Sequence, residues 1–205
     1  ARSWYTIALA SSLPSITEAV TLDASTQMGY TDGAPVIELD GSAIAGSVDG
    51  LTIATSGATV RGLVLNQFSQ DGIEITGDAN LIVGNFIGTD VSGTLDRGVT
   101  FYGISIDGAS SNNTIGGITL ADRNLISGNN GYGIEIGDVG TDDNIVIGNY
   151  IGTDVTGMVA LGNTNAGVYI ENSSTGNRIG GTSAAERNVI SGNNGDGIFI
   201  TGAGT

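Results

Sequence analysis

The stretch "RNVISGNNGDGIFI" at residues 187–200 repeats, with few changes, the stretch "RNLISGNNGYGIEI" at residues 123–136. Eleven of the fourteen positions are identical, and each lies 64 residues from its counterpart. The spacing recurs between "NLIVGNFIGTDVSG" at 80–93 and "NIVIGNYIGTDVTG" at 144–157. Similarity at a fixed long period indicates a chain built from stacked copies of one structural unit.

A shorter period lies inside the 64-residue repeat. The pattern Gly-aliphatic-x-Ile begins at six glycines, spaced 22 to 34 residues apart: Gly50, Gly72, Gly103, Gly133, Gly167 and Gly197. The shortest step holds three short apolar runs separated by turn residues, "GLTI", "ATVRG" and "LVLNQF". The longer steps carry insertions at two alternating places, 118–123 and 182–187 after the second run, and 89–102 and 153–166 after the third.

These spacings predict an all-β parallel solenoid of about six coils with three strands in each coil. If the chain winds as a coil, each strand lies against its counterpart one turn later, about 4.8 Å away. Because side chains alternate along a strand, "GIEI" directs Ile73 and Ile75 inward and Glu74 outward. Inward aliphatic side chains, including Ile134 and Ile198, then form continuous columns in which every coil completes the core of its neighbour.

Asparagine occupies the corners between the predicted strands. Four such positions follow a glycine: Asn85, Asn129, Asn149 and Asn193. Asn tolerates left-handed backbone geometry, and stacked Asn side chains can hydrogen bond to one another and to nearby amides. We therefore predict a structural role for these four residues.

The composition excludes several classes of partner. The chain has 205 residues, with 21 Asp and Glu against six Arg, no Lys and no His, and a net charge of −15. With a net charge of −15 and only six Arg to neutralise phosphates, the composition argues against nucleic acid and anionic membrane surfaces as partners. No apolar run approaches the roughly 18–20 residues that span a bilayer, so we predict no membrane insertion. The acidity serves solubility, with cations or basic partners as the alternative.

The alternation of "NxIxGNxIG" with "GIxI" over residues 50–205 resembles the right-handed parallel β-helix repeat, the superfold of pectate lyases and of many bacterial secreted proteins. The resemblance implies right-handed winding and an extracellular or cell-surface location. Residues 13–42 resemble the start of large multi-repeat bacterial surface proteins. We therefore interpret residues 1–205 as one β-helix, with 1–49 as an irregular first coil and 50–205 as regular coils.

The last residues align with the middle of a repeat. "GIFITGAGT" at 197–205 matches "GIEIGDVGT" at 133–141, so the chain stops within a repeat and without a polar cap. We expect a piece of a longer protein. An uncovered last coil leaves strand edges and apolar side chains in water, which predicts end-to-end self-association.

The outward side chains of the "GIxI" strands are the candidates for ligand binding. Successive coils present Thr52, Glu74, Ser105, Glu135, Tyr169 and Phe199, and two positions further along Thr76, Asp107, Gly137, Glu171 and Thr201. The resemblance implies polysaccharide binding on this face, as in pectate-lyase-like proteins. We predict ligand contacts by Glu135, Tyr169, Glu171 and Phe199. The alternative is that the aromatic side chains only stabilise the sheet.

No catalytic residue is predicted. Pectate-lyase relatives typically use a basic residue at the reacting carbon and polygalacturonase-like relatives a Gly-His-Gly segment, whereas this chain has no Lys, no His and only six Arg. The spacing of Glu135 and Glu171, about 8 Å between strand positions, does not exclude an inverting glycosidase, whose carboxyl groups lie roughly 6.5–9.5 Å apart. The predicted function is a non-catalytic repeat segment of a secreted or cell-surface protein, serving as a stalk or an adhesion surface. A polysaccharide hydrolase or lyase, or a fragment of one, is the alternative.

No cofactor is predicted, and calcium is the alternative to a purely structural role at one repeated corner. Asp90 and Asp154 lie in the repeated "GTDVxG" corner, where Asp most simply caps the turn. Carboxylates and loop carbonyls also suit calcium, but each corner offers one carboxylate where a tight site uses several.

Overall fold

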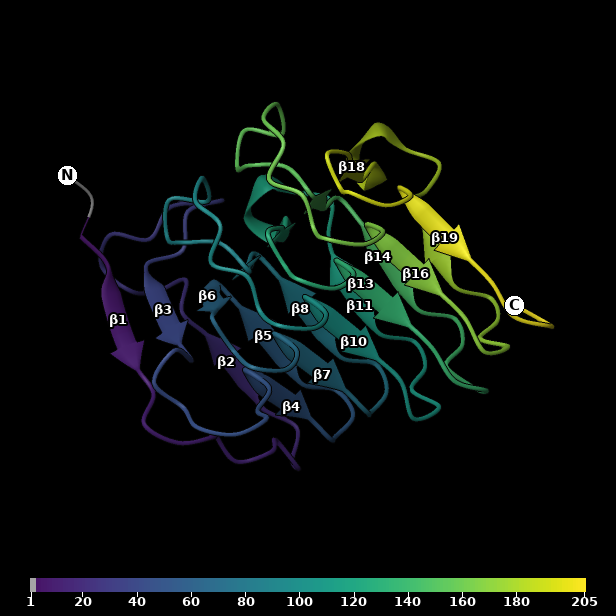
Figure 1. Cartoon of the computed structure of the whole chain (residues 1–205), viewed down its shortest axis with the longest axis horizontal. Coiled ribbons are helices and arrows are strands. Elements are labelled where there is room, and N and C mark those ends of the chain that lie inside the picture. The colour runs from purple at the N-terminus through teal and green to yellow at the C-terminus, as the bar shows by residue number, and fades with distance from the viewer. Residues whose placement is uncertain (1–2) are drawn as a thin grey trace.

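The computed structural model describes residues 3–205, which form nineteen β-strands and two short 3-10 helices. The strands form three sheets in which every strand pair is parallel (Figure 1). We call the sheets A, B and C. Sheet A contains β1 (Tyr5–Ala8), β3 (Ile37–Asp40), β6 (Leu63–Asn66), β9 (Phe86–Ile87), β12 (Leu125–Ile126), β15 (Tyr150–Ile151) and β18 (Val189–Ile190).

Sheets B and C contain six strands each. Sheet B contains β4 (Leu51–Ile53), β7 (Ile73–Ile75), β10 (Ile104–Ile106), β13 (Ile134–Ile136), β16 (Val168–Ile170) and β19 (Ile198–Ile200). Sheet C contains β2 (Thr21–Asp23), β5 (Thr59–Arg61), β8 (Leu81–Val83), β11 (Thr114–Gly116), β14 (Ile145–Ile147) and β17 (Arg178–Ile179). The 3-10 helices η1 (Leu120–Asp122) and η2 (Ala184–Glu186) lie in the two predicted insertions after sheet C.

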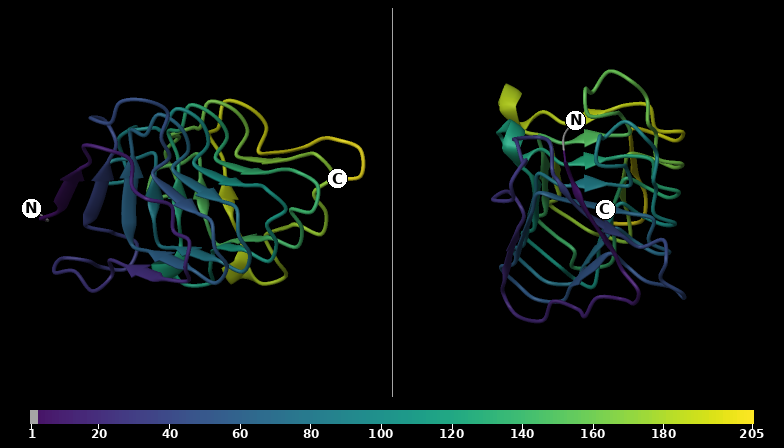
Figure 2. Two further views of the ribbon diagram at one scale, coloured as in Figure 1. Left: turned by 90° about the horizontal axis from the view of Figure 1, so that it is seen from below. Right: turned by 90° about the vertical axis from the view of Figure 1, so that its left-hand side faces the viewer.

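The chain visits the sheets in a fixed rotation, and each strand pairs with its counterpart one coil later. Strand β7, for example, pairs with β4 on one side and with β10 on the other. Viewed from the N-terminal end, the coils superimpose as a stack (Figure 2). The prediction of a parallel β-helix with about six coils and three strands per coil is confirmed, and the winding is consistent with a right-handed helix.

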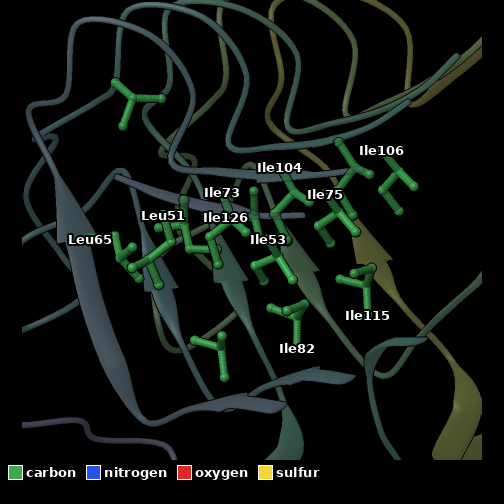
Figure 3. Close-up of a cluster of buried hydrophobic side chains, with 14 of the residues drawn as sticks. Leu51, Ile53, Leu65, Ile73, Ile75, Ile82, Ile104, Ile106, Ile115 and Ile126 are labelled. Carbon is green, nitrogen blue, oxygen red and sulfur yellow. The ribbon is translucent and has the colours of Figure 1, made fainter. Parts of the chain in front are cut away.

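The interior is a continuous set of aliphatic columns, as the alternation predicted. In sheet B, Ile73 lies beside Ile104 (Figure 3). Ile104 in turn lies beside Ile134, and all three are fully buried. The column ends at Ile198, which is 44% exposed because no coil covers it in the structure. Ile198 is therefore inward in direction but is not part of the buried core.

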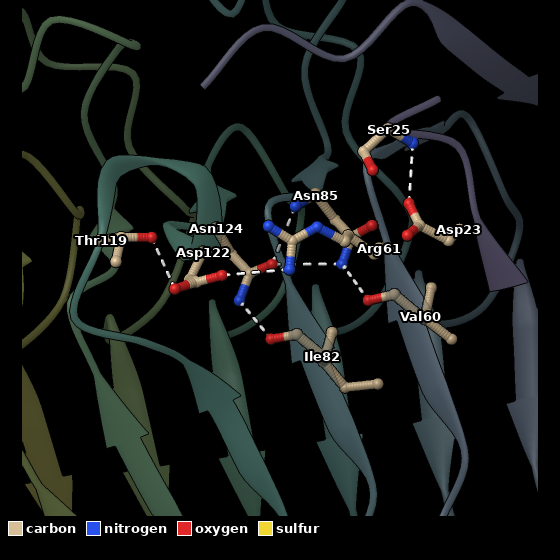
Figure 4. Close-up of polar contacts among 9 residues, drawn as sticks. All are labelled: Asp23, Ser25, Val60, Arg61, Ile82, Asn85, Thr119, Asp122 and Asn124. Atoms are coloured by element: carbon tan, nitrogen blue, oxygen red, sulfur yellow. Dashed lines mark hydrogen bonds and ion pairs between the residues drawn. The ribbon is translucent and has the colours of Figure 1, made fainter. Parts of the chain in front are cut away.

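The corners contain ladders of asparagine side chains. In each ladder the backbone N–H of one Asn donates to the side-chain oxygen of the Asn one coil later. Figure 4 shows Asn85 and Asn124, whose side-chain amides also donate to the carbonyls of Val60 and Ile82. The predicted residues belong to two ladders, Asn85–Asn124–Asn149–Asn188 and Asn129–Asn163–Asn193.

A third ladder, Asn80–Asn113–Asn144–Asn177, was not predicted. Three of its four asparagines follow Ala, Asn or Asp, so the "GN" pattern marks only Asn177.

The backbone reason given for the four corner asparagines is wrong. In the described residues Asn85, Asn129, Asn149 and Asn193 do not have positive φ angles, whereas the glycine before each does. Gly84 and Gly148 have φ angles of 67° and 72°. The glycine therefore makes the left-handed turn, and the asparagine that follows supplies the hydrogen bonds between coils.

The insertions after sheet A stack on each other and cover its outer surface. The Val155 N–H donates to the Gly93 carbonyl at 2.9 Å, which joins the loops 89–102 and 153–166. Val91 and Val155 pack with the outward side chains Phe86, Leu125 and Tyr150, together with Val64, in a second apolar cluster. The two loops therefore cover this side of sheet A. The predicted row of outward side chains lies on sheet B, away from these loops.

Residues 3–49 contribute three strands, and all three join the sheets. Strand β1 pairs with β3, and β2 pairs with β5. Between β1 and β2, Ile16 forms a single parallel bridge with Ile53 at the edge of sheet B. The described residues include no helix long and apolar enough to cross a membrane.

Candidate functional site

The outward side chains of sheet B form a row in the predicted order. The strand register places Thr52 beside Glu74, Glu74 beside Ser105, and Ser105 beside Glu135. It continues from Glu135 to Tyr169 and from Tyr169 to Phe199. We call this row and its neighbours the acidic–aromatic face: Asp49, Asp71, Glu74, Tyr102, Ser105, Asp107, Tyr132, Glu135, Asp138, Tyr169, Glu171 and Phe199.

The aromatic side chains form a longer stack than the predicted pair. Ring centroids are 5.4 Å apart for Tyr169 and Phe199, 4.3 Å for Tyr132 and Tyr169, and 5.5 Å for Tyr102 and Tyr132. Tyr102 and Tyr132 precede the glycine of "GIxI" in consecutive coils. Tyr at the same motif position in two consecutive coils is the sequence signal that could have predicted the longer stack.

The stack leaves few aromatic ring faces open to a ligand. Tyr169 is stacked between Tyr132 and Phe199, with interplanar angles of 21° and 20°. Among the described residues Phe199 has a stacked ring on one side only, and it is 41% exposed. Because a sugar stacks on the face of an aromatic ring, Phe199 offers the open face of this stack.

Tyr169 and Glu171 form one hydrogen-bonded pair. The Tyr169 hydroxyl donates to Glu171 Oε2 at 2.6 Å, and this hydrogen bond raises the pKa of Tyr169. Two of the predicted ligand-binding residues are thus brought into direct contact.

Glu135 is buried although its position points outward. It is 6% exposed, and its Oε2 accepts a hydrogen bond from Ser105 Oγ at 3.0 Å. Its Oε1 lies where a side chain at position 137 would begin, so Gly137 leaves the space that this carboxyl group occupies. Burial raises the pKa of Glu135 to about 8, and the charges of Asp107 and Glu171 add to the rise against the lowering effect of Ser105.

Further carboxyl groups on this face also have raised pKa values. Burial raises the pKa of Asp71 to about 7, with contributions from Asp49 and Glu74, although the Tyr102 N–H donates to Asp71 Oδ1 at 2.8 Å. Burial followed by the charge of Asp49 raises the pKa of Glu74, and burial followed by the charge of Asp138 raises the pKa of Asp107.

The ion pairs of the described residues lie away from this face. Arg61 pairs with Asp122, and Arg178 pairs with Glu186. The acidic–aromatic face is thus a crowded set of carboxyl groups whose charges are relieved by protonation and by hydrogen bonds from neighbouring coils.

The "GTDVxG" corners are closed turns. Asp154 Oδ1 accepts hydrogen bonds from the backbone N–H groups of Thr156, Met158 and Val159, and from Thr156 Oγ1. Burial acts to raise the pKa of Asp154, but these hydrogen bonds outweigh it and lower the pKa. The described residues contain no group of three or more acidic, His or Cys side chains arranged to hold a metal ion. The geometry supports the turn-capping role of Asp154.

The raised pKa values predict that stability falls as the pH rises. The folded chain binds more protons than the unfolded chain between the ordinary pKa of Glu135, 4.5, and its folded value of about 8. The stability from protonated Glu135 is therefore complete below about pH 4.5 and is lost as the pH rises through 8. Glu135→Gln should stabilise the chain on the order of 1–3 kcal/mol at pH 9 and much less at pH 5.

Urea unfolding at both pH values measures this difference. Glu18→Gln, at an exposed glutamate outside the face, is the control and should have little effect. An equal effect of Glu135→Gln at pH 5 and pH 9 would show that Glu135 does not titrate in this range.

Comparison with known proteins gives no relative: no family model, no curated protein and no solved structure matches the chain. The fold and the face therefore define a class only. The chain is a parallel β-helix repeat protein with a carboxyl-rich, aromatic outer face on one sheet.

Proposed function

We propose that this chain is a non-catalytic β-helical repeat segment, serving as a stalk or an interaction surface of a secreted or cell-surface protein. One observation carries the proposal: the recurring polar and aromatic side chains contact their counterparts in the next coil. The asparagine ladders hydrogen bond from coil to coil, and Tyr132, Tyr169 and Phe199 stack from coil to coil. Side chains used in this way stabilise a long scaffold.

A polysaccharide-active enzyme is the second candidate, and one observation favours it. Burial raises the pKa of Glu135 to about 8, and the charge of the neighbouring Glu171 adds to the rise, so Glu135 has the protonated carboxyl group that a general acid needs. Hydrolysis needs a sugar held between the two carboxyl groups. Here Glu135 is buried and bonded to Ser105, and Glu171 is bonded to Tyr169.

The pockets also favour the first candidate. Four pockets of the described residues lie at a corner, at the C-terminal coil and at the N-terminal end, and none of the four is lined by Glu135 or Glu171. None of these four pockets therefore holds a sugar between the two carboxyl groups.

The interaction surface is the acidic–aromatic face, and its proposed ligand is a polysaccharide. Glu135, Tyr169, Glu171 and Phe199 remain the proposed ligand contacts. The open ring face of Phe199 and the acidic side chains Glu135 and Glu171 favour a neutral sugar over a polyuronate, because carboxylates repel each other. Since the other rings cover one another, binding should be weak.

The experiment is a screen of neutral and acidic polysaccharides for binding and for release of reducing ends or unsaturated products. We expect no cleavage, and weak binding of neutral polysaccharide that falls several-fold in Phe199→Ala. Met158→Ala, at an exposed apolar residue of an insertion loop, is the control. Cleavage that is abolished by Glu135→Gln or Glu171→Gln would replace the scaffold proposal by the enzyme.

The proposed location follows from the resemblance of the repeats to those of bacterial secreted proteins. Fractionation of the source cells tests it, and recovery of the protein only from the cytoplasm would contradict it.

A further inference from the structure

Gly137 interrupts a row of acidic residues on sheet B. Strands β10, β13 and β16 pair in register, and Asp107, Gly137 and Glu171 are the residues that follow them. The backbone N–H groups of Gly137 and Glu171 each donate to a carbonyl of the preceding coil at 3.0 Å, so the three residues continue this register. Gly137 therefore lies between two acidic residues, with one coil spacing of about 4.8 Å on each side. All three strands have a paired strand on both edges.

The carboxyl group of Glu135 lies over Gly137, in the space that a side chain there would fill. Glu135 Oε1 stands where a Cβ atom of residue 137 would be, and Glu171 Cγ lies 3.5 Å from the same point. Ser105 Oγ donates to Glu135 Oε2, but no described residue donates a hydrogen bond to Oε1. Because Glu135 is only 6% exposed, Oε1 is a nearly buried acceptor without a donor, and such a group calls for a partner. We call Asp107, Glu135, Gly137 and Glu171 the Gly137 site.

The carboxyl groups of the Gly137 site lack a positive partner. None of them belongs to an ion pair in residues 3–205, where Arg61 and Arg178 pair with acidic residues outside this face. The charges of Asp107 and Glu171 both raise the pKa of Glu135, after the larger effect of burial. Negative groups are thus held together without a compensating charge, and a bound cation would relieve their repulsion.

An ammonium group suits this arrangement better than a calcium ion does. Calcium takes about six to eight oxygen ligands at roughly 2.3–2.6 Å. The Gly137 site instead offers three carboxyl groups, carried by three successive coils that are about 4.8 Å apart. An ammonium group has three N–H donors and no acceptor, so it can donate one hydrogen bond to each carboxyl group. The chemistry of the site therefore fits a primary amine in its charged form.

We infer that the Gly137 site binds the ammonium group of an amino-sugar polymer, with Asp107, Glu135 and Glu171 as the acceptors. This inference rests on the proposed polysaccharide-binding function and names the class of sugar. Sheet B presents one carboxyl group in each of four successive coils, from Glu74 to Glu171. Their spacing of about 4.8 Å is close to the advance of one pyranose unit in an extended polysaccharide. An extended peptide advances about 3.3 Å per residue, which does not match this spacing.

The test compares a glucosamine oligomer with its N-acetylated counterpart of equal length, by titration calorimetry at pH 6. Gly137→Ala displaces the flexible end of Glu135 and removes no charge, and Gly137 has no positive φ angle that would disfavour alanine. Glu135→Gln removes the carboxyl group itself. Glu18→Gln removes an exposed carboxylate outside the face and is the matched control. Urea unfolding shows that each variant is folded before its binding is measured.

We expect the glucosamine oligomer to bind at least about tenfold more tightly than the acetylated one, and to lose this preference in Gly137→Ala and Glu135→Gln but not in Glu18→Gln. A preference that survives Gly137→Ala would show general attraction to an acidic chain and would overturn the site. Equal binding of both oligomers would overturn the inference and leave the proposed polysaccharide binding intact, whereas binding of neither would count against both. Tighter binding of an oligolysine of equal charge would assign the site to a basic peptide, which also overturns the inference.

Discussion

Ile134→Asp is expected to cost at least about 4 kcal/mol of folding free energy and to leave the chain unfolded or aggregated. Ile134 is fully buried between Ile104 and Val168 in the central column of sheet B. The substitution removes a packed side chain and places a charge where no partner can reach it. Because every coil completes the core of its neighbours, the damage should spread to both adjacent coils. Urea unfolding followed by circular dichroism measures the loss.

Ile198→Asp is the matched control, because it changes the same motif position in the last coil. Ile198 is 44% exposed, so the new carboxylate keeps water and the cost should be about 1 kcal/mol. Equal losses for the two substitutions would mean that Ile134 is not enclosed by its neighbouring coils.

The fold could be predicted because its signals repeat. Alternating aliphatic residues in "GIxI" fix which side chains point inward, and a 22-residue step is too short for anything longer than three short strands with turns. Once the chain is taken to wind as a coil, the strand pairing follows, because the same motif position in successive coils lies side by side. This is why the order from Thr52 to Phe199 on sheet B was correct.

What could not be predicted depends on contacts between side chains in different coils. A side chain that points outward from the strand is not always exposed to solvent. Glu135 points outward but is buried against Ser105 and over Gly137. The alternation of inward and outward residues along the strands also does not identify Tyr102 and Tyr132. Both residues precede their strands, yet their rings join the aromatic stack. The burial of Glu135 and the stacked tyrosines decide the chemistry of the face, and both require three-dimensional positions.

The asparagine ladders are the second place where a large effect is expected. Asn144 is fully buried. Its Oδ1 accepts from the backbone N–H and the side-chain amide of Asn113, and its Nδ2 donates to Ser110 O and Asn177 Oδ1, all within 2.9–3.0 Å. Asn144→Ala leaves these buried groups without partners, and the expected cost is about 2–4 kcal/mol. Asn165→Ala, at an exposed asparagine outside the ladders, should change stability by no more than about 0.5 kcal/mol.

The central claim is that the recurring side chains of this protein hold its coils together. A double-mutant cycle between Asn113 and Asn144, measured by urea unfolding, tests it most directly, because the two residues lie in successive coils and bond to each other. The account predicts two costly single substitutions and a double substitution that costs at least about 1 kcal/mol less than their sum, since the second change removes groups already left unpaired. Small single effects that add without coupling would contradict it.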